Sequence, residues 1–315
     1  MTGSMKECKF RLVIFNESLT LIIRQGLKML ETMIQLMING LLLGGIYALI
    51  SIGLTLIFGV LEIINFAHGE FLMLAMYVTF WLFQIYGVDP YLSLLIVIPL
   101  SFLMGWVVQR GIIQPLLKAP ALNQIFATIG LSLVLQNAAL FLFKADYRTV
   151  KTSYGDWSFM IQDLMISFPR LVAFLLALAL MFSLFWYLKK TFTGKAIRAL
   201  AQERRAAMLV GINVQRTYQI AFGIGIACVG AAGAMLIPIY YVFPTVGSLF
   251  VLIAFVVVIL GGYNSLVGSV IGGLIIGVVE GFSGFFISPH LKEAVYFIIF
   301  IFILLFKPTG LLGRR

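Results

Sequence analysis

The side chains best placed for chemistry lie in residues 62–70, EIINFAHGE, a polar interruption of an otherwise apolar run over residues 34–86. Asn65, His68 and Glu70 supply an amide, an imidazole and a carboxylate. Polar groups at membrane depth are costly and usually mark a path for an ion or substrate. The segment predicts a broken or re-entrant helix with these three side chains on a translocation path. A short cytoplasmic turn between two spans is the alternative, and His68 alone also fits a hydrogen-bonded packing residue.

Enzymatic and metal chemistry find little support. The two cysteines, Cys8 and Cys228, and the two histidines, His68 and His290, lie far apart, and no HExxH occurs. Neither a disulfide framework nor a metal site is expected. No G-x-x-x-x-G-K-[ST] occurs either. We therefore expect no cofactor in this chain, and ATP and Mg²⁺, if used, would bind to partner subunits.

A second informative segment is basic. Residues 189–216, KKTFTGKAIRALAQERRAAMLVGINVQR, carry seven Lys or Arg residues against one acid, Glu203. Residues 196–209 are expected to be helical, with Thr193 or a neighbour capping the start and Gly211 ending the helix. The plain interpretation is a loop that obeys the positive-inside rule.

The spacing x-A-A-x-x-x-G at residues 205–211 favours a sharper interpretation. Small side chains let another protein approach closely, and arginines give polar contacts at the rim. We therefore expect a cytoplasmic coupling helix near 195–211 that docks an ATPase. The residues expected to take part are Gly194, Lys195, Arg198, Arg204, Arg205, Ala206, Ala207 and Gly211.

Composition sets the class of protein. Of 315 residues, 62% are hydrophobic and 11% charged, with a mean hydropathy of +1.07. Soluble domains carry about 25% charged residues, so the chain is expected to be an all-α polytopic membrane protein with about 8–10 transmembrane helices. The net charge of +10 then marks cytoplasmic loops and predicts a lipid bilayer, not a nucleic acid, as the partner.

Apolar runs and charge set the expected topology. After the broken run over 34–86, spans are expected at 91–109, 123–143, 171–188, 217–240, 246–262, 265–287 and 291–306. The basic 189–216 loop and the C-terminal tail are expected in the cytoplasm, and the aromatic, mixed-charge connector 144–170 outside. Two spans in 34–86 would put the N-terminus outside, and three short segments would put it inside. The five basic residues of 1–31 favour the inside.

Glycines are expected to pack helices. Gly268 and Gly272, and then Gly273, Gly277 and Gly281, repeat at i, i+4, so neighbouring backbones can approach closely. A helix that lines a translocation path is the alternative, because small side chains also leave room for a substrate.

Two polar features lie beside these glycines. Residues 261–268, GGYNSLVG, predict a tight turn or helix break in which Asn264 is a further candidate for the path. Glu280 is a second acid near membrane depth, or simply a residue at a helix end.

Residues 1–32 differ from the rest and are expected to be an amphipathic N-terminal extension, or to precede a later start at Met29 or Met33. They lack the pattern of a signal peptide. Residues 33–315 are expected to form one transmembrane domain.

Several motifs resemble those of one family, in order and over residues 33–313: GIYAL at 45–49, GLTLIFG at 53–59, INFAHG at 64–69, GKAIRA at 194–199, LGG at 260–262 with Ser265 and Gly268, and KPTG at 307–310. Together they resemble the inner-membrane permease of branched-chain amino acid ABC importers, the LivH-type subunit.

The resemblance implies a multi-pass protein of the bacterial inner membrane. A periplasmic solute-binding protein would deliver the solute, a second homologous permease would complete the pore, and two cytoplasmic ATP-binding subunits would drive transport. Branched-chain amino acids are the expected substrate, and urea or short amides are the alternative.

Two positions depart from the family pattern. Arg205 stands where importer permeases carry an acid in E-A-A-x-x-x-G, which leaves docking expected but its detailed contact open. Asn264 stands where the family usually has Gly.

A stand-alone secondary transporter is a less favoured function. Ion coupling needs membrane-embedded charges, and after residue 217 the chain offers only Glu280, His290, Lys292 and Glu293 before its tail.

Overall fold

The computed structural model describes residues 2–161, 163–288, 291–307 and 309–313, with side chains from residue 24 onward except that of residue 293. The helices are α1 (Thr2–Leu61), α2 (His68–Tyr86), α3 (Leu94–Val108), a π-helical turn η1 (Gln109–Ile113), α4 (Gln114–Leu116), α5 (Ala121–Phe143), α6 (Phe168–Lys190), α7 (Phe192–Gln202), α8 (Arg204–Leu209), α9 (Val214–Leu236), α10 (Val246–Gly261), α11 (Leu266–Phe286) and α12 (Lys292–Phe306). A hairpin of β1 (Ser158–Ile161) and β2 (Leu164–Ser167) precedes α6, with Ser158 opposite Ser167.

Within these described residues, seven helices are long and apolar enough to cross a membrane, and two shorter apolar helices cover residues 246–261 and 294–306. The expected all-α polytopic fold is confirmed. The expected span at 91–109 is longer in the structure, because α3, η1 and α4 form one membrane-capable segment, Leu94–Leu116.

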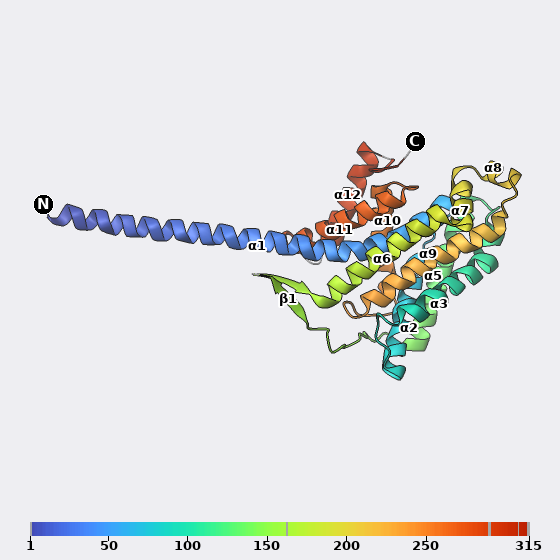
Figure 1. The fold of residues 1–315 in the computed structure, drawn as a ribbon, viewed down its shortest axis with the longest axis horizontal. Helices are drawn as coiled ribbons and strands as arrows, with labels where there is room; N and C mark the ends of the chain where they lie inside the picture. The colour runs from blue at the N-terminus through green and yellow to red at the C-terminus, as the bar shows by residue number, and fades with distance from the viewer. Residues whose placement is uncertain (1, 162, 289–290, 308, 314–315) are drawn as a thin grey trace.

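Helix α1 is the centre of the bundle. It packs against α6, α9, α10 and α11 (Figure 1), and its residues from 42 to 57 are almost all buried. The contact with α11 depends on glycine. A Cβ on Gly40 would lie 2.7 Å from Gly277 O, and one on Gly44 would lie 2.8 Å from Gly273 O. The two helices therefore run antiparallel at backbone contact, as small-residue seams allow in membranes.

Close backbone contact recurs around the bundle. Gly53 of α1 faces Gly225 of α9, and Gly261 of α10 faces Gly268 of α11. The predicted packing role of Gly268, Gly272, Gly273 and Gly277 agrees with this geometry, because an added Cβ on each would meet a neighbouring helix.

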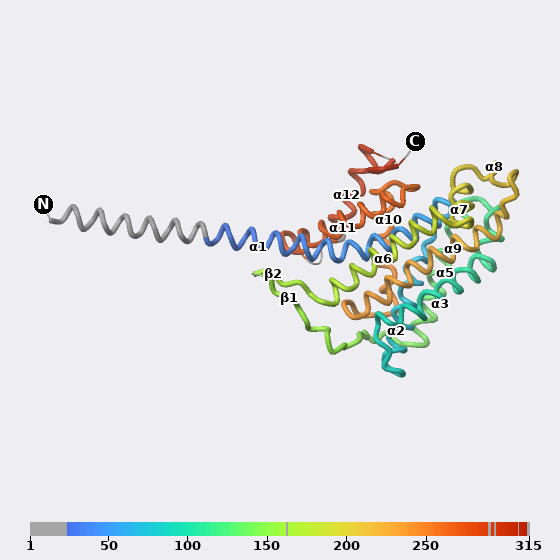
Figure 2. Tube along the Cα trace, viewed as in Figure 1, coloured from blue at the N-terminus to red at the C-terminus, as the bar shows by residue number. Residues whose placement is uncertain are grey.

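The two ends of the bundle carry different structures. Helices α7 and α8 lie at one end, where α7 contacts the C-terminal part of α1, and the β1–β2 hairpin lies toward the other (Figures 1 and 2). Gln35 of α1 bonds to Met165 of β2 through both its amide atoms, each at 2.7 Å. The Gln35 end of α1 is thus opposite to α7 and α8.

This placement bears on the expected sidedness of the N-terminal part. Residues 34–86 form two helices, not three segments, so the Gln35 end lies on the side of connector 144–170. The preference for the inside, based on basic residues in 1–31, therefore conflicts with the expected outside location of that connector, and the side of residues 24–35 stays a prediction. The separate treatment of residues 1–32 as an extension stays a prediction, and most of that range lies outside the described side chains.

Connector 144–170 is held against the α2–α3 turn by Asp89. The Asp89 carboxylate accepts hydrogen bonds from Tyr154 Oη at 2.5 Å and from the Tyr91 backbone nitrogen at 2.8 Å. Burial, and then the bond to Asp89, raise the pKa of Tyr154 well above its usual value. The tyrosine is therefore a permanent donor, and this connector is an ordered cover of one bundle end.

Candidate translocation path and docking surface

The predicted break near residues 60–70 is present and re-enters the bundle. Helix α1 ends where Glu62 adopts a left-handed φ of 58°, and residues 63, 65 and 67 are buried while 62, 64 and 66 are less so. His68 Nε2 then lies 3.0 Å from Ile50 O. Ile50 is eleven residues before Leu61, about 16 Å back along a helix. Six non-helical residues reach up to about 20 Å, so the segment returns into the bundle, and the alternative of a short turn is wrong.

Asn65 and His68 shape this re-entry. The Asn65 Oδ1 accepts a bond from the Ala67 nitrogen at 3.2 Å, and both side chains are fully buried. Their side-chain hydrogen bonds go to backbone atoms of α1 and of the turn. Whether they also face a moving solute stays a prediction.

Glu70 links three helices. Its Oε1 accepts bonds from Ser132 Oγ at 3.1 Å and Gln136 Nε2 at 2.7 Å, both from α5. Its Oε2 is buried with no hydrogen-bond partner among the described residues, and an added Cβ on Gly247 of α10 would lie 2.8 Å from it. A carboxylate with one unsatisfied oxygen is costly to bury, which supports its selection as a functional candidate.

Asn264 does not join this group. It is exposed in the turn between α10 and α11, near Gly59 at the end of α1. The adjacent Tyr263 ring packs at a tilt against Phe58, with ring centroids 5.0 Å apart. The structure therefore brings Asn65, His68 and Glu70 together and leaves Asn264 at the α7–α8 end of α1.

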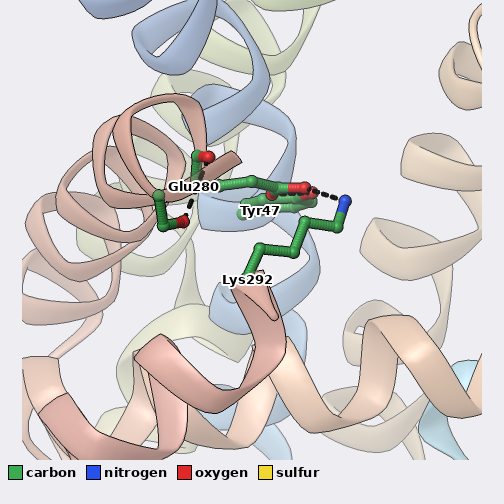
Figure 3. A network of polar contacts seen from close by, with 4 residues as sticks. Tyr47, Glu280 and Lys292 are labelled. Atoms are coloured by element: carbon green, nitrogen blue, oxygen red, sulfur yellow. Dashed lines mark hydrogen bonds and ion pairs between the residues drawn. The ribbon is translucent and has the colours of Figure 1, made fainter. Parts of the chain in front are cut away.

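Glu280 is a site residue that sequence reasoning undervalued. It is not at a helix end but six residues inside α11, where Tyr47 Oη donates to its Oε2 at 2.5 Å and Lys292 Nζ to its Oε1 at 2.6 Å (Figure 3). Its charge was visible in the sequence, but nothing there placed Tyr47, 233 residues away, beside it.

The helix predicted near residues 195–211 is present as two helices, α7 and α8. Glu203 breaks the segment with an extended backbone and caps α8 by accepting from the Arg205 nitrogen at 3.1 Å. Thr191, a neighbour of Thr193, caps α7 by accepting from the Gly194 nitrogen at 3.0 Å. Gly211 ends the segment with a φ of 82°. The single helix expected over 196–209 was wrong because a side-chain cap at Glu203 competes with helix continuation.

The docking candidates divide into buried and exposed groups. Gly194 is buried, and a Cβ there would lie 2.5 Å from Leu188 Cα; Ala207 is 3% exposed. Arg198 donates to Leu188 O at 2.9 Å, and Arg204 lies over the Tyr218 ring at 5.6 Å. These four contact α6, α9 or the bundle. Six of the eight candidates are exposed: Lys195, Arg198, Arg204, Arg205, Ala206 and Gly211.

Apolar neighbours of the exposed candidates were missed. Phe192 is 84% exposed, Leu209 89% and Val210 76%, and Met208 is also exposed. We define the docking surface as Phe192, Lys195, Arg205, Ala206, Met208, Leu209 and Val210.

A glycine-packed bundle of membrane-capable helices with a buried re-entrant segment defines a multi-pass membrane protein. The chain belongs to the family described as branched-chain amino acid transport system / permease component, whose model matches residues 36–304. It is accordingly a protein of the inner membrane.

Named relatives cover most of the chain. The high-affinity branched-chain amino acid transport system permease protein BraD of Pseudomonas aeruginosa is 33% identical over 295 residues, covering 89% of this chain and 96% of BraD. LivH of Escherichia coli K12 is 33% identical over 294 residues with the same coverage. The probable LivH of Methanocaldococcus jannaschii is 26% identical over 287 residues, covering 87% of this chain and 91% of that protein. No solved structure matches the chain.

Proposed function

We propose that this chain is a pore-forming permease subunit of an ATP-driven importer for branched-chain amino acids. Family membership supports transport, and the names of BraD and LivH support the substrate class. The sequence has no P-loop, so ATP and Mg²⁺ bind to two separate ATPase subunits.

The docking surface carries this proposal. It combines exposed aliphatic and aromatic side chains with the cations Lys195 and Arg205. Apolar side chains with basic residues at the rim suit a protein groove with acidic edges. Thr191 and Glu203 fix the orientation of α7 and α8, so the surface is rigid enough to transmit ATPase closure to α1, which α7 contacts.

The remaining partners occupy other faces. A periplasmic binding protein delivers solute at the connector 144–170 end, opposite the docking surface. A second homologous permease completes the pore alongside the bundle.

Replacing Ala206 by Glu tests ATPase docking. Ala206 is exposed, so the change leaves the bundle intact while adding an acid to a surface that contacts acidic groove edges. The ATPase subunits should no longer co-purify with the permease. Changing Ala207 as well would confound the test, because its side chain is buried.

Ala145→Glu is the matched control, since Ala145 is exposed in the opposite connector. It should co-purify as the wild type does. Normal co-purification of Ala206→Glu would contradict the docking proposal.

The substrate is tested separately by calorimetry on the cognate binding protein, where leucine, isoleucine and valine should bind. Binding of urea or a short amide in their place would contradict the substrate class.

A further inference from the structure

A cavity of about 190 Å³ lies among α1, α10, α11 and α12. Its wall is mainly aromatic and aliphatic, with side chains such as Phe250, Ile253 and Phe297. Two further lining residues, Tyr147 and Tyr241, are exposed and belong to the connectors at the end opposite α7 and α8. The cavity is therefore an apolar space that opens toward the side from which an imported solute arrives.

The polar groups of this cavity form a paired-charge network. Figure 3 shows Glu280 of α11 between Tyr47 of α1 and Lys292 at the start of α12. The Glu280 side chain is 8% exposed and that of Lys292 is 33% exposed. An apolar pair of similar volume stabilises a protein interior as well as, or better than, a buried ion pair. Packing alone therefore does not account for two charges here.

An α-amino acid zwitterion carries the same two charges. Its ammonium group can replace Lys292 Nζ at Glu280 Oε1, and its carboxylate can accept the released Lys292, while Tyr47 keeps its bond to Oε2. Every charge stays paired through this exchange, so the large cost of an unpaired buried charge is avoided. An apolar side chain on the amino acid would lie against Phe250 and Ile253. An uncharged solute has no charges to exchange.

We propose that Glu280, Lys292 and Tyr47 form a binding site within the permease for the ammonium and carboxylate groups of an apolar α-amino acid, with the aromatic cavity holding its side chain. This inference rests on the proposed import function and adds to it a substrate-selecting site in the permease itself.

Direct binding tests the site without the binding protein. The purified permease–ATPase complex should bind radiolabelled leucine in a scintillation proximity assay. Unlabelled leucine should compete, whereas leucinamide, which lacks the carboxylate, and 4-methylpentanoate, which lacks the ammonium, should compete at least about tenfold less well, because each loses a charge-assisted hydrogen bond. Absence of leucine binding, or equal competition by either analogue, would overturn the proposal.

Two variants separate binding from helix packing. Glu280→Gln leaves Lys292 without its carboxylate, whereas Glu280→Gln with Lys292→Met removes both charges and relieves that cost. If the ion pair only holds α11 to α12, the double variant should bind and transport leucine like the wild type. The proposal instead expects the double variant to match wild-type thermal stability and to lose at least about tenfold in leucine affinity. Wild-type affinity in the double variant overturns it.

Lys144→Met is the matched control, because Lys144 is an exposed cation in the outer connector; its leucine affinity should be unchanged. Uptake into proteoliposomes distinguishes failure of the proposed import function from failure of the proposed binding site. If wild-type complex with its binding protein shows no ATP-dependent uptake, the import function fails. If uptake is normal but insensitive to the loss of both charges, only the site within the permease fails.

Discussion

Glu70 shows how one side chain joins the broken segment to the bundle. Helix α2 carries it, Ser132 and Gln136 of α5 donate to one of its oxygens, and the backbone of α10 closes over the other. The carboxylate therefore has both a structural role, as an acceptor for α5, and the charge expected of a residue on a path through the membrane.

Two substitutions at Glu70 separate these roles. Glu70→Ala removes the acceptor and leaves Gln136 unsatisfied, which should cost about 1–3 kcal/mol and lower the melting temperature. Glu70→Gln keeps an acceptor oxygen and should melt close to the wild type. If the charge serves transport, Glu70→Gln will still slow leucine uptake in proteoliposomes. Wild-type uptake by Glu70→Gln would show that the residue only supports the fold.

At the scale of elements, the seam between α1 and α11 decides whether the bundle closes. A Cβ on Gly273 would lie 2.5 Å from Ala48 N, whereas nothing lies within 4 Å of one on Gly284, further along the same helix. The two glycines share a helix and differ in their surroundings, so they form a matched pair.

Alanine at these two positions should change the stability of the protein in opposite directions. Gly273→Ala must push α1 from α11 and should destabilise the protein by about 1–3 kcal/mol. Gly284→Ala gains helix propensity, up to about 1 kcal/mol, and should melt at or above the wild-type temperature. Thermal unfolding followed by tryptophan fluorescence in detergent measures both. Equal melting temperatures for the two variants would contradict backbone contact at this seam.

Local sequence predicted the elements better than their partners. The apolar runs, the break before His68 and the stop at Gly211 follow from hydropathy and backbone preferences within a few residues. The split at Glu203 did not, because helix propensity favours continuation and a single side-chain cap reverses it. The Glu280 network was also not predictable, since its members are brought together only when α1, α11 and α12 pack.

At the scale of the molecule, α1 connects two surfaces at opposite ends. Tyr47 of α1 bonds to Glu280 beside the cavity, and the C-terminal part of the same helix contacts α7. Between them, the Ile50 carbonyl oxygen contacts His68 Nε2 where the chain re-enters the bundle. A shift of α7 would therefore reach both the re-entrant segment and the cavity through one continuous helix.

This arrangement depends on the sidedness of the chain, which single cysteines can measure. In a background with Cys8→Ser and Cys228→Ser, the exposed positions Gln25, Ala145 and Arg205 are each replaced by cysteine. Gln35 bonds to the connector that follows Ala145, so positions 25 and 145 should share one face, and the basic segment puts position 205 on the cytoplasmic face. A membrane-impermeant maleimide should therefore label positions 25 and 145 in cells whose outer membrane is permeabilised and whose inner membrane is intact. Position 205 should react only after the inner membrane is disrupted. Labelling of position 25 together with position 205 would instead place the start of α1 in the cytoplasm, as the basic residues of 1–31 suggest, and would be incompatible with a single helix running from the outer connector to α7.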